Sequence, residues 1–257
     1  ANTPASFEPA LDYVVTKMPR FPFDKFSTAA NTLGTQMKAT GEVMAIDRTF
    51  EGALIKAMRC LEVGEGYIHL AKLDNQSLYD IRCLLHRVDD ERLFVIAEAL
   101  WRGIEPEEIN RITKIDLFFL YKMKNIIMAE ERLRKEGLNE DTLRNAKRIQ
   151  MPDSAIAHFI PEDEKTVTRL KKKLNIHPDY KMVDTCAAEF EAHTPYYYST
   201  YGQEDEVKPQ GSNSVIVFGS GPIRIGQGIE FDYCSVHASW ALRKAGKKAI
   251  VINNNPE

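Results

Sequence analysis

The sequence predicts a mainly α-helical protein: a central helical domain flanked by partial α/β pieces. Three observations support this fold class. Between residues 63 and 180, apolar side chains recur at helical spacing, and polar caps, prolines and glycines separate the periodic segments. The first 38 residues contain four prolines and lack a helical period. After residue 213, two short apolar runs enclose one helical segment, which is the order of a βαβ unit that begins a doubly wound, Rossmann-like sheet.

Composition excludes several classes of protein. The 257 residues include 34 basic and 37 acidic side chains, so the net charge of -3 gives no global basic field for nucleic acid or an anionic membrane. No apolar run approaches the roughly 20 residues that a membrane helix needs. The four cysteines lie far apart, and we expect buried free thiols in a cytoplasmic protein. The six histidines lack zinc-site spacing, so we expect no metal ligands.

The N-terminal part predicts one strand and one helix. Residues 12–18 alternate weakly between apolar and polar side chains, which is typical of a strand. From Thr49 onward, Ala53, Leu54, Ala57 and Met58 form a helical stripe, which glycines at 64 and 66 end. We expect this part to pack against another piece of the protein.

Short helices with recognisable caps should fill the middle of the chain. Phe118 and Phe119 are expected in their core. The basic run 169–173 suits either a nucleic-acid contact or a solvated face; the acidic residues 162–164 at the start of the same helix favour the solvated face. The expected helices follow Ser77, run from Asp89 to Trp101, from Pro106 to Ile112, from Asp116 to about Lys135, from Asn139 to Arg148, around Ile156, and from Pro161 to Asn175.

Residues 181–210 show no regular period. The stretch 196–201 is rich in tyrosine, and the acidic stretch 202–209 is bounded by glycine and proline. We therefore expect irregular structure followed by a linker.

A glycine-rich loop follows the strand expected at 214–218. A dinucleotide-binding fingerprint needs glycine where Arg224 stands and an acid where residues 253–255 are asparagine, so NAD binding is disfavoured. No Gly-Lys-Ser/Thr follows, which excludes a P-loop. The glycines then serve either a ligand or the turn geometry alone. The candidate loop residues are Gly219, Gly221, Pro222, Arg224, Gly226, Gln227 and Glu230.

A helix should run from about Asp232 to Ala245, with Asp232 as its cap and Cys234 as a buried small residue. A strand at 248–252 would follow. Because a two-stranded sheet is not a stable domain, we expect the chain to be a piece of a larger protein, in keeping with its missing initial methionine.

Several long motifs occur in order along the chain. The first are Thr3–Pro9, Asp12–Lys17 and Gly41–Ile46, and the later ones are Val183–Phe190, Arg224–Cys234 and Asn255–Glu257. In sequence and order they resemble the carbamoyl phosphate synthetase large-chain family. Only the helical middle lacks a long motif. The resemblance spans essentially the whole chain.

The resemblance implies a large chain with two ATP-grasp halves. The first makes carbamate from bicarbonate and ammonia, and the second phosphorylates carbamate to carbamoyl phosphate for arginine and pyrimidine synthesis. It also implies three parts here: 1–62 as the tail of the first half, 63–206 as the helical oligomerization domain, and 207–257 as the pre-ATP-grasp start of the second half. ATP and Mg or Mn (with K) would bind elsewhere in the enzyme. The isolated piece would be inactive.

The resemblance further implies partners and site residues. The partners are a second copy of the chain and a glutaminase small chain, with no nucleic acid and no membrane. Glu42, Gly228 and Glu257 match positions that line or gate the family's carbamate tunnel, where enclosure protects carbamate from water. Taken alone, Glu42 would be an exposed loop acid and Glu257 a polar residue after a strand. No catalytic residue is expected.

The rival functions are an NAD-dependent oxidoreductase with a helical cap and a helical nucleic-acid-binding protein.

Overall fold

An antiparallel hairpin opens the fold of the computed structural model, which describes residues 4–62, 66–202, 204–219, 221, 225–226, 228 and 230–253. Strands β1 (Val14–Arg20) and β2 (Gly41–Asp47) pair with Val14 opposite Asp47 and Arg20 opposite Gly41. Strand β1 confirms the strand expected near residues 12–18. Strand β2 was not expected, because its buried face of Val43, Ala45 and Asp47 includes an acid that hides the apolar alternation.

Helix α1 (Phe50–Cys60) follows the hairpin and packs on it. The Thr49 side chain accepts a hydrogen bond from the amide of Gly52 (3.0 Å), which satisfies one donor of the first turn. The predicted stripe is buried, since Ala53, Leu54, Ala57 and Met58 are each at most 3% exposed. Helix α1 therefore presents one apolar face to the hairpin and to the helices beyond.

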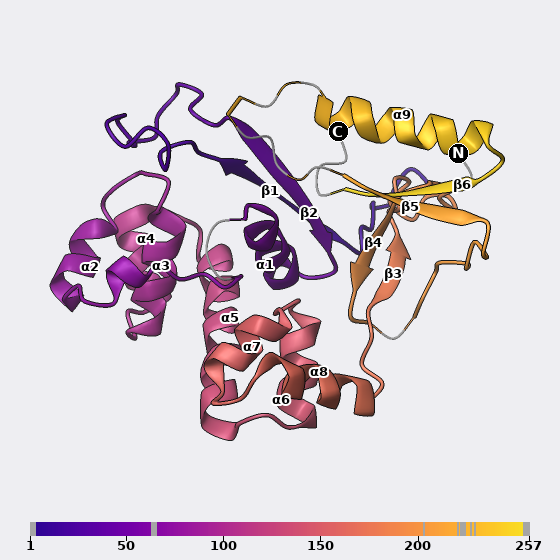
Figure 1. Ribbon diagram of the computed structural model, residues 1–257. Coiled ribbons are helices and arrows are strands. Elements are labelled where there is room, and N and C mark those ends of the chain that lie inside the picture. The colour runs from indigo at the N-terminus through magenta and orange to yellow at the C-terminus, as the bar shows by residue number, and fades with distance from the viewer. Residues whose placement is uncertain are drawn as a thin grey trace.

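The middle of the chain is helical, as predicted (Figure 1). Ser77 and Asn139 each form a capping box with the third helical residue, and Asp116 accepts from the amide of Phe118 (2.8 Å). The elements are η1 (Ala71–Leu73), α2 (Leu78–Leu84), α3 (Arg92–Trp101), α4 (Pro106–Thr113), α5 (Leu117–Glu136), α6 (Glu140–Arg148), α7 (Asp153–Phe159) and α8 (Glu164–Lys173).

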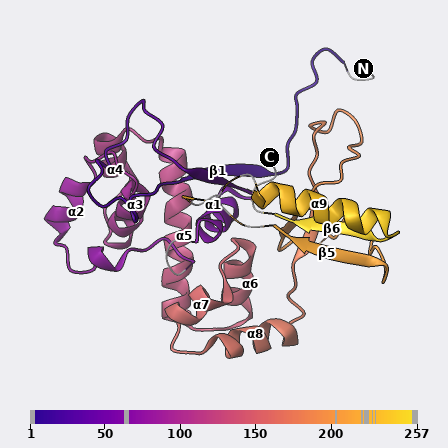
Figure 2. The same ribbon diagram turned by 45° about the horizontal axis from the view of Figure 1, so that its top comes forward.

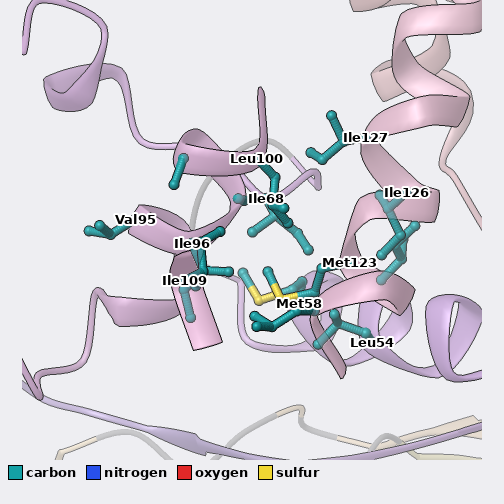
Figure 3. Packing of buried hydrophobic residues seen from close by; sticks show 14 of the residues in the cluster. Leu54, Met58, Ile68, Val95, Ile96, Leu100, Ile109, Met123, Ile126 and Ile127 are labelled. Carbon is teal, nitrogen blue, oxygen red and sulfur yellow. The ribbon is translucent and has the colours of Figure 1, made fainter. Parts of the chain in front are cut away.

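Two apolar cores meet along α5, the long helix between α2–α4 and α6–α8 (Figures 1 and 2). The first core joins Leu54 and Met58 of α1 to Ile96 of α3 and Met123 of α5 (Figure 3). The second surrounds Leu133 near the end of α5 and draws on α6, α7 and α8. Helix α1, expected in the preceding segment 1–62, thus shares the core of the helical domain.

Phe118 and Phe119 do not lie in the core as expected; they are 54% and 44% exposed. The buried stripe of α5 runs through Leu120, Met123 and Ile127, and the two phenylalanines fall beside it. Their rings instead contact Phe50 at the edge of the core, with centroids 6.2 and 5.4 Å away.

No disulfide joins the four cysteines, which all lie among the described residues. None is fully buried, so the expectation of burial was wrong: Cys60 and Cys186 are half-buried, and Cys83 and Cys234 are exposed. The exposed Cys83 and Cys234 both lie on helices, on the side that faces solvent.

A second hairpin occupies part of the stretch expected to be irregular. Strands β3 (Asp179–Met182) and β4 (Tyr197–Thr200) pair antiparallel, with Asp179 opposite Thr200. Tyr198 and Thr200 are buried on alternate positions of β4, a pattern that the surrounding tyrosines masked. The expected linker also has fixed contacts: the amide of Glu206 donates to the carbonyl of Tyr180 (2.9 Å), and the Glu206 carboxylate accepts from Lys181 (2.9 Å).

The C-terminal segment forms the predicted βαβ unit. Strands β5 (Ser214–Phe218) and β6 (Lys248–Ile252) are parallel, and α9 (Glu230–Lys244) packs on both. In both views this unit lies on the side of the first hairpin away from α2–α4 (Figures 1 and 2). Within the described part of the chain, no helix has both the length and the apolar character needed to span a membrane.

Candidate functional site

Glu42 lies on β2 as a partly exposed carboxylate. It shares a face with Met44 and Ile46, opposite the face that packs on α1. The Lys17 ammonium lies 2.8 Å from its Oε1 atom, and the Glu42 side chain is 38% exposed. The hairpin therefore holds this acid in a defined place by an ion pair across the strands.

At the other end of β2, the buried Asp47 joins the strand to the start of α1. Its side chain has no solvent exposure. The Oδ1 atom accepts a hydrogen bond from Nε2 of Gln150 (2.9 Å), and Oδ2 accepts from the amide and hydroxyl of Thr49 (3.3 Å each). Because a buried carboxylate must be paired, this network fixes the hairpin against both α1 and the loop after α6.

Lys56 links three elements at the same place. Its Nζ atom lies 3.4 Å from Asp47 Oδ1 and donates to the carbonyls of Ile46 (2.7 Å) and Ser199. Burial lowers the pKa of Lys56, and the Asp47 carboxylate opposes that shift. Strand β2, helix α1 and strand β4 are thus held by one ammonium group.

The glycine-rich loop begins where β5 meets the end of β6. The amide of Gly219 donates to the carbonyl of Ile252 (2.8 Å), and a β-carbon at Gly219 would lie 2.5 Å from Oδ1 of Asn253. Gly221 and Gly226 adopt left-handed φ values of 79° and 84°. These three glycines therefore meet steric or backbone demands of the turn itself.

The remaining loop residues are described only in part. Gly228 is exposed and precedes α9, and Glu230 begins α9, with only its backbone described. Pro222, Arg224, Gln227 and Glu257 lie outside the described residues.

Two of the three tunnel candidates are among the described residues: Glu42 lies on β2, and Gly228 lies in the loop before α9. Strand β2 packs on β1, α1 and β4, whereas α9 packs on β5 and β6.

One group of possible metal ligands occurs among the described residues. Ligand atoms of His69, Asp74 and Glu98 lie within 4.8 Å of one another. Each already has a partner: His69 Nε2 is 3.2 Å from Asp74 Oδ1, and Arg102 lies 2.5 Å from Glu98 Oε1. These contacts already occupy ligand atoms of the group, which belongs to the helical region.

Comparison with known proteins gives two family matches along the chain. The family described as carbamoyl-phosphate synthetase large chain, oligomerisation domain, matches residues 42–175, more than half of the chain. The chain belongs to the carbamoyl phosphate synthase large-chain family. Residues 211–257 match the carbamoyl phosphate synthase preATP-grasp domain, which agrees with the βαβ unit.

Curated large chains are similar over the entire sequence. The chain is 55% identical over 258 residues to the carbamoyl phosphate synthase large chain of Lachnoclostridium phytofermentans. It is 56% identical over 256 residues to that of Thermoanaerobacter pseudethanolicus. Each alignment covers 100% of this chain and 24% of the relative, so the chain spans about a quarter of their length.

Membership of this family disfavours both rival functions, the oxidoreductase and the nucleic-acid-binding protein. The helix carrying residues 169–173 also agrees with the solvated face: Arg169, Lys172 and Lys173 are exposed, and Lys171 binds Asp153 (2.5 Å). Sequence reasoning missed Asp47 and Lys56. A glycine at position 52, inside an apolar helical stripe, was the available signal that a neighbouring group takes its side-chain space.

Proposed function

We propose that these residues connect the two synthetase halves of a carbamoyl phosphate synthase large chain. The observation that carries the proposal is the order of the two family matches: an oligomerisation domain at 42–175, followed at 211 by the start of a preATP-grasp domain. A domain that precedes a new catalytic half within one chain is placed to join it to what comes before.

The complete enzyme would make carbamoyl phosphate from bicarbonate, glutamine-derived ammonia and two ATP, for arginine and pyrimidine synthesis. A glutaminase small chain would supply the ammonia. ATP and its Mg or Mn ion would bind in other parts of the large chain. We place the enzyme in the cytoplasm, and four cysteines that form no disulfide agree with a reducing compartment.

We retain three parts for the chain, but propose to begin the helical domain near Glu42 instead of residue 63. Two findings support this change. The family match begins at residue 42, and Leu54 and Met58 of α1 share a core with Ile96 and Met123. The segment before Glu42 would then be the tail of the first half, and 207–257 the start of the second.

We propose that Glu42, Gly228 and Glu257 contribute to a passage for carbamate. Glu42 supports this as a partly exposed carboxylate on a hairpin that Asp47 and Lys56 hold in place. A carboxylate at a passage wall can order water and repel an anion from the wall, while glycine at 228 leaves room for transit. Enclosure would protect carbamate from hydrolysis.

Self-association is the second role, and we propose the outer face of α5 for the contact with a second copy. Phe118, Tyr121 and Met128 follow one face of this helix and are 54%, 46% and 56% exposed. The matched oligomerisation domain contains the whole of α5. An apolar face within a domain named for oligomer formation fits a second copy of the same chain.

Two measurements on the 257-residue chain test this assignment. The chain alone should form no carbamoyl phosphate from ATP, bicarbonate and ammonia, because it would lack the ATP-binding parts of both halves. It should sediment as more than one copy at micromolar concentration. Synthesis by these residues alone would overturn the assignment to a connecting role, and a strictly monomeric chain would overturn self-association.

A further inference from the structure

A polar pocket of about 480 Å³ lies at the end of α1, between α7, α8 and the segment after β4. We call it the Lys147 pocket. Its charged and hydroxyl groups include those of Arg59, Lys147, Asp153, Lys171 and Tyr201. The volume falls within the range of small-molecule sites, about 300 to 1,000 Å³. No role in joining synthetase halves requires these charges to gather here.

Asp153 is already neutralised by its neighbours. Its Oδ1 atom accepts a hydrogen bond from Lys147 (2.8 Å), and Oδ2 accepts from Lys171 (2.5 Å) and the Thr168 hydroxyl (3.2 Å). Lys147 also donates to the carbonyl of Met151 (2.8 Å) and is only 4% exposed. The carboxylate thus fixes two ammonium groups at the wall of the pocket.

Two further donors face the pocket without a partner. Within the described part of the chain, neither the Arg59 guanidinium nor the Tyr201 hydroxyl has a hydrogen bond or an ion pair, although Lys147 lies 4.9 Å from the centroid of the Tyr201 ring. Burial lowers the pKa of Lys147. The Asp153 carboxylate opposes that shift, and the charges of Lys171 and Arg59 add to it.

The charge balance favours an anion. Three cations face two carboxylates, namely Asp153, which is paired, and Glu164, which is exposed at the rim. Arginine presents a planar fork of donors that matches a tetrahedral oxyanion, and a tyrosine hydroxyl adds one more donor. We propose that the Lys147 pocket binds a phosphate group, either as inorganic phosphate or as part of a phosphorylated metabolite.

Protection of Lys171 from acetylation tests the proposal in the full chain, because this readout is local to the pocket. With about 10 mM phosphate and a Kd of about 1 mM, the site is about 90% filled, so acetylation should slow about tenfold. Lys173, exposed on the same helix, should keep its rate. Equal protection by inorganic phosphate and adenosine monophosphate indicates recognition of the phosphate group alone. Stronger protection by the nucleotide indicates a phosphorylated metabolite.

Variants separate the pocket from general charge effects. Arg59→Gln should weaken protection about tenfold or more, because it removes charged hydrogen bonds. Arg148→Gln, which removes an exposed cation outside the pocket, should not. Tyr201→Phe keeps the aromatic ring beside Lys147 and should also weaken protection. This variant still tests the pocket if Arg59→Gln fails to fold. Two results would overturn the proposal. One is that chloride at matched ionic strength protects Lys171 as well as phosphate does. The other is that phosphate still protects Lys171 fully in both pocket variants.

Discussion

A β-carbon on Gly52 would lie 2.1 Å from the Oδ2 atom of Asp47. Gly52 is inside α1, where glycine costs about 1 kcal/mol relative to alanine. The buried carboxylate cannot turn aside freely, because Gln150 and Thr49 hold both of its oxygens. The glycine in the helix and the acid at the end of the strand therefore depend on each other.

Gly52→Ala should destabilise the chain. Overpacking against Asp47 should lower the free energy of unfolding by about 1–3 kcal/mol, although the same change in an open helix raises it. Urea denaturation measures the difference. In an Asp47→Ala background, Gly52→Ala should leave the free energy of unfolding unchanged or raise it. Strictly additive effects of the two substitutions would contradict the steric coupling.

Lys56→Met should loosen the second hairpin. The substitution keeps most of the buried length but removes the donor to the carbonyls of Ile46 and Ser199. Because a charged hydrogen bond contributes about 1.5–3 kcal/mol, amides of β4 should exchange at least about tenfold faster with deuterium. Lys165→Met, at an exposed position on α8, is the control. Unchanged exchange in β4 would show that Lys56 does not hold it.

Glu130 should make stability fall as pH rises. Its side chain is buried on α5, and burial raises its pKa from 4.5 to about 8, against the charge of Arg134. Between those values the folded chain holds a proton that the unfolded chain has released. The free energy of unfolding should therefore drop by up to about 1.4 kcal/mol per pH unit until the pH passes about 8.

Glu130→Gln should abolish this component and stabilise the chain most above about pH 8. Unfolding by urea at several pH values measures it. Glu136→Gln, at an exposed carboxylate of the same helix, should leave the slope as it is. Identical slopes in the native chain and the Glu130→Gln variant would rule out the buried proton.

Met128→Ser should weaken self-association. The side chain is 56% exposed on the face of α5 proposed for the contact with a second copy, so its loss should shift sedimentation toward smaller species. Tyr79→Ser removes a side chain that is 75% exposed on α2, away from that face, and should leave the distribution unchanged. If only Tyr79→Ser dissociates the protein, the contact involves α2 and not α5.

Local signals predicted the helices well, and long-range partners explain most of the misses. Ser77 and Asn139 act as caps, because capping involves residues three positions apart. Strand β2 was missed because a buried Asp47 needs Gln150, which lies 103 positions away. The exposed Phe118 shows a second limit: composition gives an apolar helix, but only packing decides which side chains fall beside the buried stripe.

The candidate sites divide in the same way. Turn glycines such as Gly221 and Gly226 were visible, because a left-handed φ favours one residue type. The Lys147 pocket was invisible, because Arg59, Asp153 and Tyr201 come together only through the packing of α1, α7 and the segment after β4.

The ratio of overall synthesis to the two partial activities tests the proposed carbamate passage most directly. In the full-length enzyme, Glu42→Lys and Gly228→Leu should greatly reduce carbamoyl phosphate formation, while bicarbonate-dependent ATP hydrolysis and ATP formation from carbamoyl phosphate persist. Lys17→Met breaks the same ion pair but keeps the Glu42 carboxylate, so it should retain synthesis. Synthesis at the native rate in both Glu42→Lys and Gly228→Leu would contradict a carbamate passage through these residues.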